Sequence, residues 1–551
     1  MRRGAVAVAA ALALGSVAAC APQVRRDGTA DEVARAFDQR ATAVSATAAT
    51  ALPPAQLSLV HAPTPLRGAN GLACFDRHLV VAEALGDRLL RVSADGSLEP
   101  LALPSGLQGP DDLVFDDAGA LFVTAAASGE VWRRGPEGSW STVARGLRGV
   151  NAIARAPSGR LFVSTCVLGD GLYEVDPAGS APPREIARDL GCPNAMVADD
   201  DGTLVVPLLT AGKVVRVAGA DGSSTVLADG LRAPSAVKRA PDGSLVVLEA
   251  ASGVIRALGG ATPGPGAELA QLAPGLDGFA ACGDSAVVSN FLTGAIVAIK
   301  PWPGAARQLE PPGLAVPRGL AQAGELLLVS DGVSIRRLRG QTAEILAATA
   351  IDAIPPPYAL ALAPDGAVWI TVPHFGEVHR IDLAARTSEK VAGGLDWPTS
   401  IVATPHGGVF VTDSGAGRIL EVLPEGGTRV VASGLAAPLG LALRGAQLLT
   451  VEPEGGRVLG FREGSPPTLV ATGLAGPVGL AVDASGRLYV AETRTGYLIR
   501  VDSDGSRTRI AQGFDFRTSG KQPAPIALLA ETGGGVLVAL PRDGSIVRVT
   551  P

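Results

Sequence analysis

The stretch LAGPVGLAVDASGRLYVAETRTGYLIRVDSDGSRTRIAQG, Leu474–Gly513, decides the fold. It contains four short runs of β-branched or long apolar residues, GLAV, LYVAE, LIRV and TRIAQ, which are typical of β-strands. Turn-forming residues separate these runs, among them Pro477, Asp483–Gly486 and Asp504–Gly505. Strands of four or five residues bury little surface alone, so we expect a four-stranded unit that needs similar units beside it.

The same pattern recurs about every 40 residues from Leu66 onward, which is the spacing of propeller blades or solenoid repeats. No helical periodicity is sustained across the repeats, which argues against helical or leucine-rich solenoids. Four-stranded antiparallel units of this length build β-propellers. We align twelve copies, beginning at Leu66, Leu107, Leu147, Leu190, Leu231, Leu276, Leu314, Ala353, Leu395, Leu435, Leu474 and Phe514.

The ends and the middle of the chain indicate how these copies divide. The last copy stops after its third strand, Ile546–Val549, and a lone strand, Gln56–Val60, precedes the first copy. Midway, the third strand Ala295–Ile299 runs into Lys300–Gly304, whose two prolines should end strand pairing. A strand-like segment, Arg307–Glu310, follows.

We therefore predict an all-β fold of two tandem six-bladed β-propellers, residues 55–300 and 305–551. In each, the N-terminal strand is expected to complete the last blade, so Gln56–Val60 would pair beside Ala295–Ile299. A single twelve-bladed ring is the alternative, but propellers typically have about four to eight blades.

The N-terminus predicts export. Arg2 and Arg3 precede an apolar region, Ala5–Leu14, and small residues lead to Cys20. The tetrapeptide Val17–Cys20 resembles a bacterial lipobox, which implies that residues 1–20 are a lipoprotein signal peptide and that Cys20 is lipidated. An ordinary secretory signal is the alternative. Residues 21–54 are rich in Ala and Thr and are expected to tether the folded part to the membrane of the cell envelope, the outer membrane if the source is Gram-negative.

Composition limits the partners. The formal net charge is −6 and no basic stripe is interleaved with aromatics, so nucleic-acid binding has no electrostatic basis. Beyond the N-terminus, no apolar run reaches the length of a membrane-spanning helix. We expect a monomer that binds a small molecule, or a protein or glycan partner.

Five cysteines are present, and Cys20 has its own role. Cys166 ends the second strand of the third copy and Cys192 precedes the first strand of the fourth, so both lie on one face of adjacent blades, and we expect a disulfide between them. Cys74 and Cys282 lie in the inner strands of the first and sixth copies at offsets that differ by about one residue. A one-residue offset turns side chains to opposite faces, so these two are expected to be free thiols.

The pattern P-x-G-[LI]-A, then D-x-x-G-x-L-[YFW]-V, then I-x-R-[VI] resembles NHL-type repeats and the propellers of the gluconolactonase and senescence-marker superfamily. Leu474–Val501 and Leu395–Val422 carry it best, and Tyr358–Ile381 additionally resembles a virginiamycin B lyase repeat. The resemblance implies the propeller fold. It leaves hydrolase, lyase and pure binding functions open, because one fold hosts many activities.

In such a propeller, residues that enter each inner strand and residues that leave each second strand gather at the mouth of the ring. In the first half the entry position is polar in Asn70, Asp111, Asn151, Asn194 and Ser235, and the exit position is polar in Glu83, Thr165, Glu249 and Asn290. Oxygen ligands with few cations nearby suit Ca²⁺ or Mg²⁺. We expect a small ligand or divalent cation here, with Asn70, Ser235, Glu249 and Asn290 binding the ligand.

The resemblance implies a metal held by Asp111, Asn151 and Asn194, with Glu83 as a fourth ligand. As an enzyme, the protein would use the metal to polarise a lactone or ester carbonyl while Glu83 or Asp111 activates water. The family's N-terminal E-G-P segment has no match at Leu66–Asn70, which departs from the lactonase pattern. A non-enzymatic scaffold, a lyase, and simple turn-capping by these Asn and Asp residues are the alternatives.

The second half has a different mouth. Its entry position reads Arg318, Tyr358, Thr399, Leu439, Val478 and Ile526, and its exits include Asp331, Asp413, Glu452 and Glu492. Asp331 or Glu492 is expected to pair with Arg318. His374 lies near this mouth, and a solvated loop residue is the simpler interpretation of a lone histidine.

Overall fold

The computed structural model describes residues 55–551 except 77, 94–95, 167, 260–263, 350 and 518–523. The expected signal peptide, Cys20 and the tether lie outside the described residues. The described chain is an all-β repeat of twelve four-stranded antiparallel sheets, a β-propeller-like architecture, with one short 3-10 helix, η2 (Pro373–Phe375). Among the described residues no helix has the length and apolar character needed to cross a membrane.

Six sheets are built from consecutive strands of the first half, which we call the first ring. Its strands, four to a sheet in chain order, are β2 (Ala69–Phe75), β3 (His78–Glu83), β4 (Arg88–Val92), β5 (Leu98–Leu101); β6 (Pro110–Phe115), β7 (Leu121–Ala125), β8 (Glu130–Arg134), β9 (Trp140–Ala144); β10 (Val150–Arg155), β11 (Leu161–Thr165), β12 (Gly171–Val175), β13 (Arg184–Arg188); β14 (Val197–Ala198), β15 (Leu204–Leu208), β16 (Lys213–Val217), β17 (Ser224–Ala228); β18 (Pro234–Arg239), β19 (Leu245–Glu249), β20 (Val254–Ala257), β21 (Glu268–Gln271); β22 (Leu276–Cys282), β23 (Ser285–Asn290), β24 (Ile296–Ile299) and β25 (Ala306–Glu310).

The other six sheets form the second ring, whose last sheet borrows its outer strand from the start of the chain. Its strands are β26 (Pro317–Ala323), β27 (Leu326–Asp331), β28 (Ser334–Arg339), β29 (Thr342–Ala348); β30 (Leu360–Leu362), β31 (Val368–Val372), β32 (Glu377–Asp382), β33 (Thr387–Ala392); β34 (Pro398–Ala403), β35 (Val409–Asp413), β36 (Arg418–Val422), β37 (Thr428–Ala432); β38 (Leu441–Arg444), β39 (Gln447–Glu452), β40 (Arg457–Phe461), β41 (Thr468–Ala471); β42 (Pro477–Val482), β43 (Leu488–Glu492), β44 (Tyr497–Val501), β45 (Arg507–Ala511); and β46 (Leu528–Ala530), β47 (Val536–Leu540), β48 (Ser545–Thr550) with β1 (Gln56–His61).

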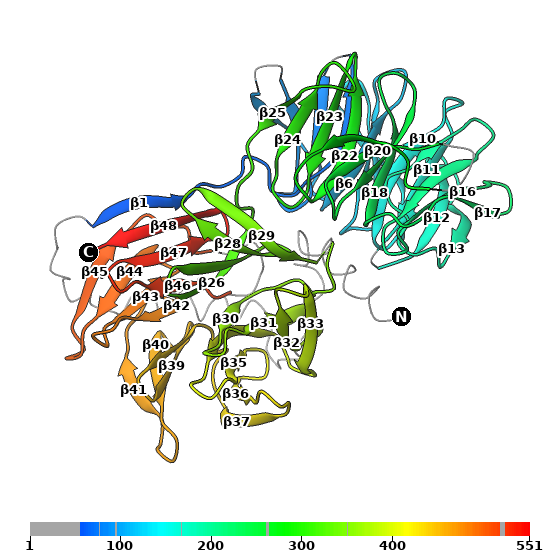
Figure 1. Ribbon diagram of the computed structural model, residues 1–551. Coiled ribbons are helices and arrows are strands. Elements are labelled where there is room, and N and C mark those ends of the chain that lie inside the picture. The colour runs from blue at the N-terminus through cyan, green and yellow to red at the C-terminus, as the bar shows by residue number, and fades with distance from the viewer. Residues whose placement is uncertain are drawn as a thin grey trace.

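The sheets of each half follow one another around a closed circuit. In the first ring each innermost strand contacts that of the next sheet, from β2 through β6, β10, β14 and β18 to β22, and β22 returns to β2. In the second ring the same order runs from β26 through β30, β34, β38 and β42 to β46, which returns to β26. Figure 1 shows the two groups of sheets as separate bodies, blue to green and green to red.

The closing strands differ from the prediction. Strand β1 does not pair beside Ile296–Ile299; it pairs antiparallel with β48, from Gln56 opposite Thr550 to His61 opposite Ile546, and the blue strand lies beside the red one in Figure 1. The sixth sheet is completed by β25, which pairs with β24. The predicted closures of both rings were therefore wrong: Arg307–Glu310 completes the sixth sheet and not the last one, which β1 completes. The predicted boundary at 300–305 cuts through a sheet.

The proline-rich segment explains this error. Lys300–Gly304 joins β24 to β25 as a turn, with the Lys300 amide donating to the Ala305 carbonyl at 3.0 Å. Trp302 packs edge-on against Phe279 of the same sheet, with ring centroids 5.5 Å apart. Prolines thus end one strand and turn the chain back, instead of separating two domains.

Small residues after the entry position let neighbouring inner strands approach closely. A Cβ on Gly479 would lie 2.5 Å from the Ile526 carbonyl oxygen of the next sheet, and one on Gly71 would lie 2.5 Å from the Cα of Asp112. Ala195 and Ala236 occupy the same position and form a direct parallel bridge. The glycine of P-x-G-[LI]-A therefore has a packing role in these sheets, since a Cβ there would collide with the next sheet.

The first ring closes without an exchanged strand. Leu66, Leu72 and Val81 of the first sheet pack against Ala280 and Val287 of the sixth in one buried cluster. A disulfide between Cys74 and Cys282 joins the two inner strands, with Cα atoms 5.6 Å apart. The expectation of free thiols was wrong, because the two strands belong to different sheets and their offset is no guide to which way they face each other.

Replacing Gly479 with Ala tests the close approach of the inner strands. The new methyl group would collide with the Ile526 carbonyl, and overpacking of this kind costs about 1–3 kcal/mol. Urea unfolding should show that loss for Gly479→Ala and little change for Gly533→Ala, whose Cβ would meet nothing within 4 Å. Equal stability of the two variants would contradict the packing argument.

Candidate functional site

Five of the carboxylates at the exit of the second strands are structural braces. Each of the five accepts a hydrogen bond from a backbone amide about 16 residues earlier, in the loop that enters its own sheet. This holds for Glu83 with the Arg67 amide, and the same bond recurs in the second ring at Asp331, Asp413, Glu452 and Glu492. Four of the five also pair with an arginine five residues later: Glu83–Arg88, Asp331–Arg336, Asp413–Arg418 and Glu452–Arg457.

Glu83 therefore does not face the expected metal site. Its carboxylate is fully buried, and both oxygens accept from Arg88, with Oε1 also accepting from the Arg67 amide at 2.6 Å. None of its contacts in the described residues involves Asp111, Asn151 or Asn194. A carboxylate neutralised by arginine in this way is poorly suited to activate water or to bind a cation.

Two other predicted ligand residues are also held by their own sheets. Glu249 accepts hydrogen bonds from Ser252 Oγ at 2.6 Å and Arg256 Nε at 2.8 Å. Asn290 donates to the carbonyls of Ala273 and Pro274 and accepts from the Thr293 amide. Both side chains are buried, so they brace loops instead of facing the mouth.

The entry residues do come together. Asn151 Nδ2 donates to Asp111 Oδ1 at 3.0 Å across the second and third sheets. Asn70, from the first sheet, lies on the other side of Asp111. All three side chains are at most 5% exposed. These three entry residues therefore gather as expected from the sequence, and their role in binding stays a prediction.

Three further charged residues belong to the same site and were missed. Asp277 occupies the entry position of the sixth sheet, in Leu276-Asp277-Gly278, where Leu replaces the usual Pro. Asp112 follows Asp111, at the position that carries Gly or Ala in the other sheets of this ring. Lys238 of the fifth sheet reaches Asp112 of the second, with Nζ 3.4 Å from Oδ2. The repeat alignment could have revealed Asp277, whereas the pairing across the ring depends on closure.

The acids at this mouth bind protons more tightly than usual. Burial raises the pKa of Asp277 to about 8, helped by the charge of Asp112 and opposed by Lys238. Burial likewise raises the pKa of Asp111 well above its ordinary range, and Asp277 and Asp112 add to this. The Asn70 side chain opposes the rise, although its Nδ2 has no hydrogen-bond partner of normal geometry. Asp277 is half-buried and provides the exposed side of the group.

Several polar atoms of this group lack partners within the described protein. They are Asn70 Nδ2, Asp111 Oδ2 and Asn151 Oδ1, all of them buried. Buried polar atoms are nearly always hydrogen-bonded to protein or to ordered water, so each such atom is available to a water molecule or a ligand. One amide N–H group, one amide oxygen and one carboxyl oxygen are thus available in this group.

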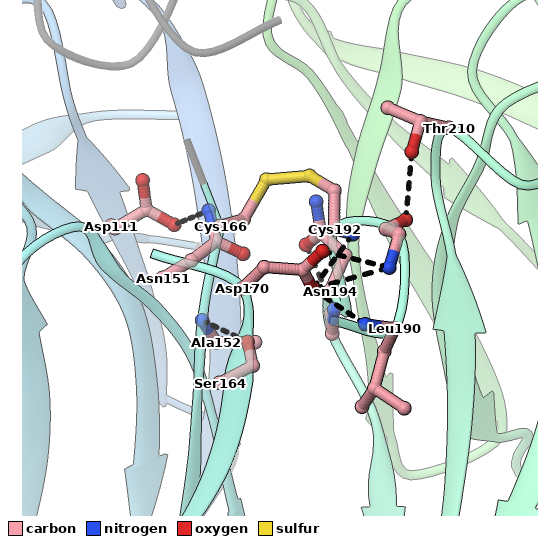
Figure 2. Close-up of a disulfide and its surroundings, with 12 residues drawn as sticks. Asp111, Asn151, Ala152, Ser164, Cys166, Asp170, Leu190, Cys192, Asn194 and Thr210 are labelled. Atoms are coloured by element: carbon pink, nitrogen blue, oxygen red, sulfur yellow. Dashed lines mark hydrogen bonds between the residues drawn. A yellow bond between two sulfur atoms is a disulfide. The ribbon is translucent and has the colours of Figure 1, made fainter. Parts of the chain in front are cut away.

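The side chains of the remaining entry residues are hydrogen-bonded within the protein, and a disulfide lies nearby. Asn194 Oδ1 accepts from the Ala195 amide at 2.8 Å, and Ser235 Oγ donates to the Leu276 carbonyl at 2.8 Å. The expected disulfide Cys166–Cys192 joins the third and fourth sheets next to the Asp111–Asn151 pair, as Figure 2 shows. The Asp170 carboxylate accepts from the amides of residues 190, 191 and 192, which fixes the loop that carries Cys192.

The predicted metal ligands do not assemble as a set. Of Glu83, Asp111, Asn151 and Asn194, only Asp111 and Asn151 are in contact, and the Lys238 ammonium lies at the neighbouring Asp112. The part of the chain that the structure describes contains no group of three or more His, Cys, Asp or Glu side chains arranged for a metal. The four ligands named from the sequence therefore do not form one site, and the divalent cation stays a prediction.

No protein-family model matches the sequence, and no curated protein matches it either. Among solved structures, a chain from a crystal structure of a nidogen/laminin complex aligns with 40% of this chain and 91% of its own length. The aligned residues are 18% identical and the TM-score is 0.33. At this level of similarity we draw no conclusion about function.

The raised pKa of Asp277 predicts a pH dependence of stability. Between the unfolded value near 3.8 and about 8, the folded protein holds a proton that the unfolded chain releases, so rising pH favours unfolding. Asp277→Asn should therefore stabilise the protein increasingly as pH rises from about 5 to about 9. Urea midpoints across this range measure the effect, with exposed Asp117→Asn as the control. A gain that does not grow with pH would contradict the raised pKa.

Proposed function

We propose that the chain forms two tandem six-bladed β-propellers related to NHL-type and gluconolactonase propellers. The closed order of contacts among six inner strands in each half supports the blade count. The ion pair between Lys238 and Asp112, on opposite sheets of the first ring, supports a narrow central axis. The first propeller runs from 66 to 310, and the second from 314 to 551 with β1 as its closing strand.

We further propose that the protein acts outside the cytoplasm, tethered to the membrane through Cys20. The lipobox-like Val17–Cys20 carries the anchor. The two disulfides, Cys74–Cys282 and Cys166–Cys192, support an oxidising compartment, because cytosolic proteins rarely keep such bonds.

The function that the first mouth supports best is the binding of a small polyhydroxylated molecule, such as a sugar or a sugar lactone. The observation that carries this proposal is the group of unpartnered buried atoms, Asn70 Nδ2, Asp111 Oδ2 and Asn151 Oδ1. Hydroxyl groups both donate and accept, so one ligand can satisfy a donor and two acceptors together. A cation would satisfy only the oxygens.

The charges favour the same ligand class. Asp111 and Asp277 have raised pKa values, so a neutral ligand avoids burying additional charge beside them. The half-buried Asp277 gives access from solvent. Hydrolysis is not part of this proposal, since Glu83, one of the two residues expected to activate water, is paired with Arg88.

Calorimetric titration of the purified chain with D-glucose and with glucono-1,5-lactone tests the ligand class. Asp111→Ala removes an acceptor that the ligand would use and should weaken binding about tenfold, as expected for one or two lost hydrogen bonds. Asp117→Ala, at an exposed carboxylate paired with Arg155, is the matched control and should bind as the wild type does.

Calcium chloride in the same titrations separates this proposal from its main rival. Binding of Ca²⁺ that Asp111→Ala abolishes, with no heat from either sugar probe, would show that the mouth is a cation site. Absence of binding by all probes would refute a ligand site of either kind. Following the lactone over time would reveal hydrolysis directly.

Cys20→Ser tests the anchor. Without the thiol no lipid can be attached, so the variant should move from the membrane to the soluble fraction of disrupted cells, while the wild type should require detergent for release. Fractionation followed by immunoblotting measures this. A variant that remains in the membrane fraction would contradict lipid anchoring through Cys20.

A further inference from the structure

The mouth of the second ring carries a cation and aromatic rings where the first carries acids and amides. Arg318 is the second residue of β26, the position that Asn70 holds in β2, and it is half-buried. Tyr358 follows at the entry of the next sheet and is buried. The Arg318 guanidinium carbon lies 4.9 Å from the centroid of the Tyr358 ring, the arrangement of a cation–π contact.

The four carboxylates at the strand exits of this ring, which include the expected partners Asp331 and Glu492, all bond to groups other than Arg318. Asp331 accepts from the amides of Ala315 and Val316 and pairs with the buried Arg336. Glu492 accepts from the Ala475 amide and from Thr495 Oγ1. Asp413 and Glu452 pair with their own arginines.

The remaining entry positions offer no carboxylate either, since they are Thr399, Leu439, Val478 and Ile526, all buried. Throughout the described ranges, 55–551 without the gaps given above, Arg318 makes no ion pair. A half-buried guanidinium without a counter-ion carries an uncompensated positive charge, which a bound anion would stabilise.

Two further aromatic side chains form a pair close to Arg318, which acts on one of them, His374. His374, in η2, and Trp397, just before β34, meet edge to face with centroids 5.0 Å apart, and both are half-buried. Trp397 has a φ of 63°, a left-handed conformation that the equivalent residues Ala233 and Ala437 share, so the turn of the repeat sets the backbone here and the sequence places an indole on it.

Arg318 is the cation of this group, because His374 is uncharged at neutral pH. Burial and the charge of Arg318 lower the pKa of His374 to about 4, so the imidazole is neutral near pH 7. A neutral imidazole can still donate one hydrogen bond and accept another. Arg318 is the charged group that acts on His374, and Arg318 in turn lies against Tyr358, whose phenol pKa is raised by burial.

We propose that Arg318, Tyr358, His374 and Trp397 form a second binding site, for a small aromatic carboxylate. The carboxylate would accept two parallel hydrogen bonds from the edge of the Arg318 guanidinium, whose face lies against Tyr358. The flat body of the ligand would pack against Trp397, which is half-buried and so has part of its ring free. This site uses the second ring and is independent of the sugar site in the first.

Titration calorimetry with sodium benzoate as the probe tests this site in the purified full chain. Arg318→Met should weaken benzoate binding at least about tenfold, because the charge-assisted pair is lost. Arg318→Lys should fall between the two, since lysine keeps the charge without the two-pronged geometry. Trp397→Leu should weaken benzoate binding and leave the binding of inorganic phosphate unchanged.

Matched controls separate the site from general effects. Arg380→Met removes an exposed arginine that pairs with Asp365 and should bind benzoate as the wild type does, as should Asp111→Ala in the first ring. Circular dichroism and urea unfolding establish that each variant is folded. If Arg318→Met does not fold, Arg318→Lys and Trp397→Leu carry the test.

Three results would overturn the proposal. The first is no heat from benzoate with the wild type, and the second is unchanged affinity in folded variants of both Arg318 and Trp397. The third is inorganic phosphate binding as tightly as benzoate with no effect of Trp397→Leu, which would show a simple anion site without an aromatic component.

Discussion

The close approach of neighbouring inner strands is the constraint on which the rest of the structure depends. Gly71, Gly278, Gly319, Gly440 and Gly479 each lie where an added Cβ would meet the adjacent sheet. The other sheets use Ala or Ser at this position, except the second sheet, which has Asp112, and small side chains let short strands pack closely around an axis. The residue just before this small residue is thereby held at the mouth of the ring. Asn70, Asp277 and Arg318 occupy this entry position, so the packing of the inner strands also determines which polar side chains reach the mouth.

The structure separates two kinds of acid that look alike in sequence. Carboxylates that leave the second strand are braces, since most accept a hydrogen bond from the loop that enters their own sheet and most pair with an arginine. Carboxylates that enter the inner strand, Asp111 and Asp277, have no arginine and carry raised pKa values. The difference is electrostatic. The charge of a brace is balanced by hydrogen bonds and arginines of the protein itself, whereas the mouth of the first ring leaves polar atoms without a protein partner.

The two rings are joined by more than a linker. Strand β1 is the first of the described strands yet completes the last sheet of the second ring, so the segment that follows it must cross to the first ring. There it runs beside the chain that returns: the Thr64 amide donates to the Leu314 carbonyl at 2.9 Å. Buried side chains from both rings, including Phe291 and Val333, share one cluster at this crossing. The N-terminal strand therefore couples the stability of the second ring to the position of the first.

The sequence by itself determined the repeat, the four strands of each unit and the entry residues Asn70, Asp111 and Asn151, because these follow from local alternation, turn residues and register within one unit. It also indicated the Cys166–Cys192 pair, which lies at matching ends of consecutive sheets. Only the tertiary structure decided which strand closes which ring, since Gln56–His61 and Arg307–Glu310 are both lone strands with similar patterns and pairing partners far apart in the chain. The Cys74–Cys282 bond, the Lys238–Asp112 pair and the engagement of Glu83 by Arg88 were likewise decided by closure and packing. Contacts between sheets leave no periodic mark on a single strand, so they become visible only when the ring is complete.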